Sequence, residues 1–127
     1  MTDDPSENPV VLLVEDDGLL LMEASDTLAE AGFTVIEAPH ADKALTLLEG
    51  RDDVGVLMTD VDMPQGSMDG FALARLVSRR WPEIPVLVVS GMGFPGPHDM
   101  PEGARFISKP YQPSALVRTL RAVVSAA

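Results

Sequence analysis

Short, unbroken apolar runs are the feature of this sequence that most restricts its fold. Three of them, Val10–Val14, Val54–Met58 and Val86–Val89, contain no polar side chain. A strand that is buried on both faces has this pattern, whereas a strand with one solvated face alternates apolar and polar residues. Two further segments, Phe33–Ala38 and Ala104–Ile107, complete a set of five predicted strands.

Segments with helical spacing separate these strands. We predict helices over Leu19–Ala31, which stops at Gly32, over Ala41–Leu48, and over Phe71–Arg80, and a last helix that starts at Pro113–Ser114. Strands that alternate with helices imply right-handed crossovers and a parallel sheet covered on both faces. The sequence therefore predicts a doubly wound α/β domain, in which ligands bind at the carboxyl ends of the strands.

The segment between the fourth and fifth predicted strands breaks this alternation. Residues 91–103 contain Gly91, Gly93, Gly96, Gly103, Pro95, Pro97 and Pro101. Glycine and proline both disfavour a regular helix. We expect a loop or at most one helical turn here, so that the fourth helix of the domain is short or absent.

Length and composition limit the remaining possibilities. The 127 residues, 46% of them apolar, fit one domain, which we place at residues 9–127 after a disordered, acidic tail at residues 1–8. The absence of cysteine excludes disulfides and thiolate zinc sites, and a formal charge of −11 disfavours nucleic-acid binding.

No apolar run is long enough to cross a membrane and no secretory signal is present, so we expect a cytoplasmic location.

Chemically useful side chains follow the predicted strands. Glu15, Asp16 and Asp17 follow the first strand, Asp60 and Asp62 the third, Ser90 the fourth and Lys109 the fifth. Each one alone is more often a helix cap, a turn former or a solvated charge. The fold, however, brings all of these strand ends to one edge of the sheet.

Carboxylates that meet at one edge repel one another unless a cation compensates their charge. Because every available ligand is an oxygen, Mg²⁺ is the expected ion. An ionised Asp60 beside Mg²⁺ is a competent nucleophile toward phosphorus, and the Lys109 ammonium and the Ser90 hydroxyl would share the charge of the phosphoryl oxygens.

These residues lie in motifs that strongly resemble the receiver domains of two-component response regulators. The motifs are VVLLVEDD at 10–17, VLMTDVDMP at 56–64 with MDG at 68–70, VLVVSG at 86–91 and FISKPY at 106–111. The resemblance implies a flavodoxin-like sheet of five parallel strands in the order 2-1-3-4-5. It also implies a single phosphoacceptor, Asp60.

The resemblance assigns roles to the other residues. Asp16 would bind Mg²⁺ directly, Glu15 would hold it through water, and Asp60 and the backbone carbonyl of Asp62 would be further ligands. Ser90 would be the switch hydroxyl, Phe106 the switch aromatic residue and Lys109 the partner of the phosphate, with a cis Lys109–Pro110 bond. We expect Asp17 to cap the first helix, although spacing alone does not decide which two of the three acids hold the metal.

The chain departs from the family pattern at four places. Ser90 replaces the commoner threonine, Phe106 stands where many members have tyrosine, and Gln65-Gly66-Ser67 lengthens the loop after Asp60. The fourth departure is the segment 91–103, which stands in place of the family's fourth helix. We expect this segment to become ordered on phosphorylation.

We therefore expect a signalling domain that is not an enzyme beyond its own phosphorylation and slow dephosphorylation. Its partner would be a histidine kinase or phosphotransfer protein docked on the first helix, and the domain would stand alone as a monomer or weak dimer, without nucleic acid or membrane.

One alternative is the receiver segment of a hybrid histidine kinase. Another is a phosphohydrolase of the haloacid dehalogenase type, which has a motif like Thr59–Asp62 but places its metal-binding acids last. A degenerate, unphosphorylated receiver would lack one of the key residues, and all are present.

Overall fold

The computed structural model describes residues 9–63, 67–91, 95–96 and 98–125. The predicted tail at residues 1–8 and most of the lengthened loop at Gln65–Ser67 lie outside the described residues. The elements in chain order are β1 (Val10–Val14), α1 (Gly18–Glu30), β2 (Thr34–Ala38), α2 (Ala41–Gly50), β3 (Val54–Asp60), α3 (Gly70–Arg80), β4 (Val86–Ser90), β5 (Arg105–Ser108) and α4 (Pro113–Ser125).

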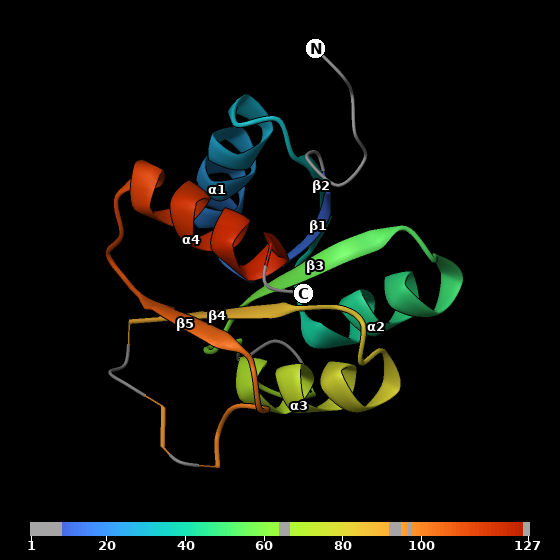
Figure 1. The fold of residues 1–127 in the computed structure, drawn as a ribbon. Coiled ribbons are helices and arrows are strands. Elements are labelled where there is room, and N and C mark those ends of the chain that lie inside the picture. The colour runs from blue at the N-terminus through green and yellow to red at the C-terminus, as the bar shows by residue number, and fades with distance from the viewer. Residues whose placement is uncertain (1–8, 64–66, 92–94, 97, 126–127) are drawn as a thin grey trace.

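All five strands are parallel and form one sheet in the order β2-β1-β3-β4-β5. The predicted fold class and strand order are thus confirmed. Helices α1 and α4 cover one face of the sheet, and α2 and α3 cover the other (Figure 1). No helix in the described part of the chain is long and apolar enough to span a membrane.

The double coverage explains the unbroken apolar runs. In β1, Leu12 and Val14 belong to the core cluster that lies against α2 and α3. Val11 and Leu13, which point to the other face, belong to the cluster against α1 and α4. Successive side chains of a strand face opposite ways, so in a strand covered on both sides both sets of side chains are buried.

Boundaries differ from the sequence prediction by one or two residues. The third strand runs on through Thr59 and Asp60, so Asp60 is its last residue rather than a residue two positions beyond its end. Thr59 is fully buried there although it is polar. The fifth strand is Arg105–Ser108, one residue later than predicted.

The described residues between β4 and β5 form no helix, as the glycine and proline content predicts. The segment is fastened to α3, because the Arg75 guanidinium donates a hydrogen bond of 2.7 Å to the Asp99 carbonyl. The Asp99 carboxylate in turn accepts from the Gly96 N–H at 2.6 Å, and Met100 packs against the core. Figure 1 shows the described residues of this segment, in orange, on the side of the sheet where α3 lies. Its ordering on phosphorylation remains a prediction.

Candidate functional site

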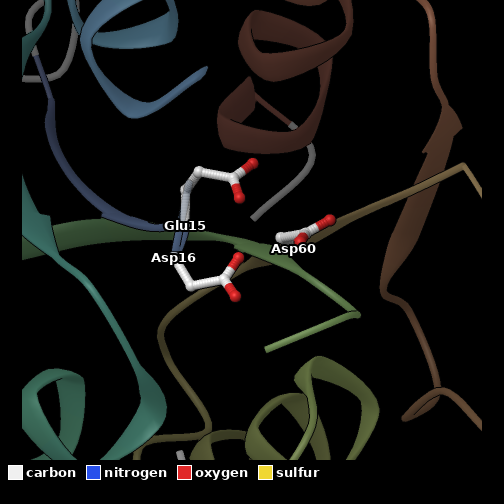
Figure 2. Close-up of side chains that lie close together, drawn as sticks. All are labelled: Glu15, Asp16 and Asp60. Carbon is white, nitrogen blue, oxygen red and sulfur yellow. The ribbon is translucent and has the colours of Figure 1, made fainter. Parts of the chain in front are cut away.

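Three carboxylates gather at the carboxyl edge of the sheet. Glu15 and Asp16 follow β1 directly, and Asp60 ends β3, the strand beside β1. Each offers one oxygen within 4.8 Å of the others, and Figure 2 shows the three side chains around one gap. The backbone N–H of Glu15 donates to the Ala38 carbonyl at 3.1 Å, which continues the sheet pairing past β1 and fixes the direction in which Glu15 leaves the strand.

Two of these carboxylates are nearly inaccessible to solvent. Glu15 is 6% exposed and Asp60 is 7% exposed, whereas Asp16 is half-buried. Burial raises the pKa of Glu15 and of Asp60, because a desolvated carboxylate loses the water that stabilises its charge. The negative charges of Asp16 and Asp62 raise the pKa of Asp60 further, and the pairing with Lys109 offsets only part of this increase.

Lys109 joins the two buried carboxylates. Its Nζ lies 3.0 Å from Glu15 Oε1 and 3.0 Å from Asp60 Oδ1. Burial alone would lower the pKa of the ammonium, but its hydrogen bonds to both carboxylates outweigh burial and raise that pKa. The Lys109 N–H also donates to the Ser90 carbonyl at 2.9 Å, so β5 and β4 remain paired up to the site. The Lys109–Pro110 bond is cis, the isomer that the resemblance implies.

The other predicted site residues lie around this group. Ser90 is the last residue of β4 and is 2% exposed. Phe106 is half-buried on β5 and packs against the cluster beneath α2 and α3. The Asp62 side chain is exposed and is not one of the three clustered carboxylates, so only its backbone remains a candidate ligand.

Asp17 has the capping role that was predicted for it. Its Oδ1 accepts from the N–H groups of Leu19 at 3.0 Å and Leu20 at 3.1 Å, which orders the first turn of α1. The Asp17 N–H also donates to Glu15 Oε2 at 3.2 Å. The Glu15 carboxylate is therefore held by the backbone of Asp17 as well as by Lys109.

Two residues that contact Asp60 were not predicted from the sequence. The buried Thr59 hydroxyl donates to the Asp60 carbonyl at 2.9 Å. Gly70, the first residue of α3, packs against the backbone of Asp60 and Val61. A buried threonine in an otherwise apolar strand and a glycine that opens a helix were the available signals.

The composition of the cluster fits a hard divalent cation. Three carboxylates share one ammonium group, so two negative charges remain uncompensated if all three are ionised. Their oxygens are close enough to ligate one ion, and oxygen is the ligand atom that Mg²⁺ prefers.

A doubly wound parallel sheet with clustered acids and a lysine at its carboxyl edge defines a flavodoxin-like domain with an acidic site that fits a divalent cation. The chain belongs to the response regulator receiver domain family, whose model matches residues 11–121. It is therefore a signalling domain of the two-component type.

Individual relatives agree with this assignment. The chain is 30% identical to the chemotaxis protein CheY1 of Helicobacter pylori, with 90% of this chain and 95% of that protein covered. It is 36% identical to the transcriptional regulatory protein DctD of Rhizobium meliloti over 91% of this chain but only 25% of that protein. The crystal structure of the receiver domain of NtrX from Brucella abortus superimposes with a TM-score of 0.84 at 25% identity, covering 92% of this chain and 99% of that one. The chain thus spans a quarter or less of its longer curated relatives.

Proposed function

We propose that Asp60 accepts a phosphoryl group from a phosphohistidine of a histidine kinase or phosphotransfer protein. The observation that carries this proposal is the position of Asp60 within reach of two further carboxylates and 3.0 Å from the Lys109 ammonium. An acid in this setting can be a nucleophile toward phosphorus while the surrounding groups compensate the charge of the transferred phosphoryl group.

The proposed transfer forms one bond and breaks one. An Asp60 carboxylate oxygen bonds to phosphorus while the phosphorus–nitrogen bond of the donor breaks, and the donor imidazole retains the electron pair. The Lys109 ammonium then pairs with a phosphoryl oxygen, and the Ser90 hydroxyl donates to another. Hydrolysis later restores Asp60. We assign the protein no other catalytic activity.

The same residues would hold the metal. We propose Asp16 and Asp60 as direct Mg²⁺ ligands, Glu15 as a ligand through water and the Asp62 carbonyl as a further ligand. Bound Mg²⁺ supplies charge compensation for the phosphoryl oxygens. The Glu15 carboxylate already accepts a hydrogen bond from the Lys109 ammonium at 3.0 Å. It would therefore have to serve both Lys109 and a metal-bound water.

Helix α1 carries the surface that we propose for the phosphodonor protein. Leu19, Leu20 and Met22 are 60%, 38% and 54% exposed, which is unusual for large apolar side chains. Beside them lies a cavity of about 420 Å³ that reaches the site and is lined by Glu15, Leu20, Glu23, Lys109, Pro110 and Tyr111. A donor histidine delivered over α1 would thus arrive at Lys109 and Asp60.

The switch and the wider setting are also proposals. Phosphorylation would alter the surroundings of Ser90 and Phe106 and so change a surface that another protein recognises. We propose a cytoplasmic monomer or weak dimer that acts without nucleic acid or membrane. The same receiver could stand alone or form part of a hybrid kinase, since the chain also matches 13% of the sensor kinase CckA of Brucella abortus.

Incubation with acetyl phosphate and Mg²⁺ tests the function directly. Intact-mass measurement should show the addition of one phosphoryl group, and peptide mapping should place it on Asp60. The Asp60→Asn variant should remain unmodified. No modification of the wild-type protein, or modification at another residue, would contradict the proposal.

A further inference from the structure

Gly70 lies closer to a neighbouring backbone than the other glycines for which contacts are known. A Cβ atom at this position would overlap the Asp60 carbonyl oxygen and would lie 2.7 Å from the Asp60 carbonyl carbon and 2.8 Å from Val61 Cα. Nothing lies within 4 Å of a Cβ at Gly18 or Gly50. The start of α3 therefore rests directly on the backbone of the residue that we propose as the phosphoacceptor.

The same carbonyl group has a second contact. The Thr59 hydroxyl donates to the Asp60 carbonyl oxygen at 2.9 Å, and Thr59 is fully buried. The side chain therefore bonds a neighbouring peptide group inside the protein, where water cannot replace the bond.

Neither α3 nor the end of β3 can move away from this contact. Helix α3 is fixed by the buried side chains of Leu73, Ala74 and Val77. On the other side, the Val61 N–H donates to the Val89 carbonyl at 3.1 Å and holds the end of β3 against β4. The Gly70 N–H donates to the Val61 carbonyl at 2.9 Å, which closes the loop between them. A larger residue at position 70 must displace the backbone of Asp60.

We propose that Gly70 and Thr59 are positioning residues for phosphoryl transfer, which fix the main chain of Asp60 and thereby the direction of its carboxylate. This inference rests on the proposed function of Asp60. A misplacement of about 1 Å at a reacting group costs about 100-fold in rate, because the nucleophile leaves its line of attack. Neither residue touches the phosphoryl group itself.

Four variants test the inference, with the initial rate of Asp60 phosphorylation by acetyl phosphate at saturating Mg²⁺ as the readout. Gly70→Ala should be slowed at least tenfold. Thr59→Val keeps the shape but removes the hydroxyl and should be slowed about threefold to tenfold, whereas Thr59→Ser keeps the hydroxyl and should restore the rate to within twofold of wild type. Gly50→Ala, with open space around the new methyl group, should match the wild type.

A destabilised variant separates positioning from general loss of stability. Leu48→Ala removes a buried side chain on α2 without touching the backbone of Asp60, and it should phosphorylate at the wild-type rate under conditions where circular dichroism shows it folded. If Leu48→Ala is slowed as much as Gly70→Ala, the effect is structural and the inference is wrong. If Gly70→Ala does not fold, the comparison of Thr59→Val with Thr59→Ser decides, and equal rates for these two variants would overturn the inference.

The outcomes also distinguish the inference from the function on which it rests. A wild-type protein that is not phosphorylated on Asp60 refutes the proposed function, and the positioning role with it. A wild-type protein that is phosphorylated, with Gly70→Ala and Thr59→Val within twofold of it, refutes the positioning role alone.

Discussion

At the scale of single residues, Lys109 is the only cation that the described structure places against the buried carboxylates. We predict that Lys109→Ala slows the phosphorylation of Asp60 by about 100-fold, the usual cost of removing one charge-stabilising donor from a reaction site. Phosphorylation by acetyl phosphate, followed by intact-mass measurement, gives the rate. Lys43→Ala, at an exposed position of α2, is the matched control and should react like the wild type. Equal rates for the two variants would exclude a role for Lys109.

Burial of the carboxylates predicts an unusual pH dependence of stability in the metal-free protein. The pKa values of Asp60 and Glu15 are raised in the folded state, so the folded protein binds protons more tightly than the unfolded chain. Ionised carboxylates therefore reduce the free energy of unfolding at neutral pH, and this free energy recovers as the pH falls through the raised pKa values toward about 4.

Asp60→Asn removes one of these charges. We predict that, without metal, this variant is more stable than the wild type at neutral pH and that the difference shrinks as the pH is lowered toward about 4. Urea unfolding in the presence of a chelator, repeated across this range, measures the difference. A difference that stays constant or grows on acidification would show that burial does not raise the pKa of Asp60.

Which site residues can be predicted from sequence depends on whether their signal is local. Glu15, Asp16 and Asp60 stand at the ends of apolar runs, and Asp17 stands where a helix begins, so local pattern marks all four as candidates, although spacing alone does not decide which two of Glu15, Asp16 and Asp17 would hold a metal. The Gly70 contact with the backbone of Asp60 becomes visible only when α3 is placed against β3. The Thr59 hydroxyl bonds the carbonyl of the next residue in the strand, and the sequence does not show the side-chain orientation that makes this bond.

At the scale of elements, the segment between β4 and β5 also combines a feature with a local sequence signal and contacts that have none. Its glycines and prolines predict the absence of a regular helix. They do not indicate what the segment packs against, because the bond from Arg75 to the Asp99 carbonyl joins residues 24 positions apart. The bond between Ser67 Oγ and Asp42 Oδ1, which ties the loop before α3 to α2, spans 25 positions and has no local signal either.

We predict that the Arg75 hydrogen bond protects this segment from local opening. Arg75→Ala should accelerate hydrogen exchange of the amides in residues 98–104 by roughly fivefold to tenfold, the effect of losing a bond worth about 1 kcal/mol. Peptide-resolved exchange monitored by mass spectrometry makes the measurement. Arg79→Ala lies on the same helix at an exposed position and should leave exchange unchanged. Equal exchange in the two variants would mean that Met100 and its neighbours hold the segment without Arg75.

At the scale of the whole molecule, the strand order creates the site. Alternation of strands and helices predicts the parallel sheet, but it does not say which strands are neighbours, and the expected order came from the family resemblance. In the order β2-β1-β3-β4-β5, β1 and β3 are adjacent, so the acids at their carboxyl ends meet although Glu15 and Asp60 are 45 residues apart in the sequence. The site therefore exists only when the sheet is complete.

This dependence couples metal binding to folding. A cation that binds the folded protein and not the unfolded chain stabilises the fold by about 1.4 kcal/mol at ten times its dissociation constant. We predict a stabilisation of this size by Mg²⁺ in the wild type, measured by urea unfolding at constant ionic strength. Asp16→Asn should abolish most of it, because the Asp16 carboxylate is one of only three described carboxylates that reach the site.

A matched control distinguishes this effect from general screening of the acidic surface. Asp26→Asn removes an equal charge from an exposed position of α1 and should leave the full stabilisation by Mg²⁺. If Asp16→Asn and Asp26→Asn respond alike to Mg²⁺, the ion stabilises the protein by screening its net charge of −11 rather than by binding at the sheet edge. Loss of the effect in Asp16→Asn alone would mean that the ion binds at the sheet edge through the Asp16 carboxylate.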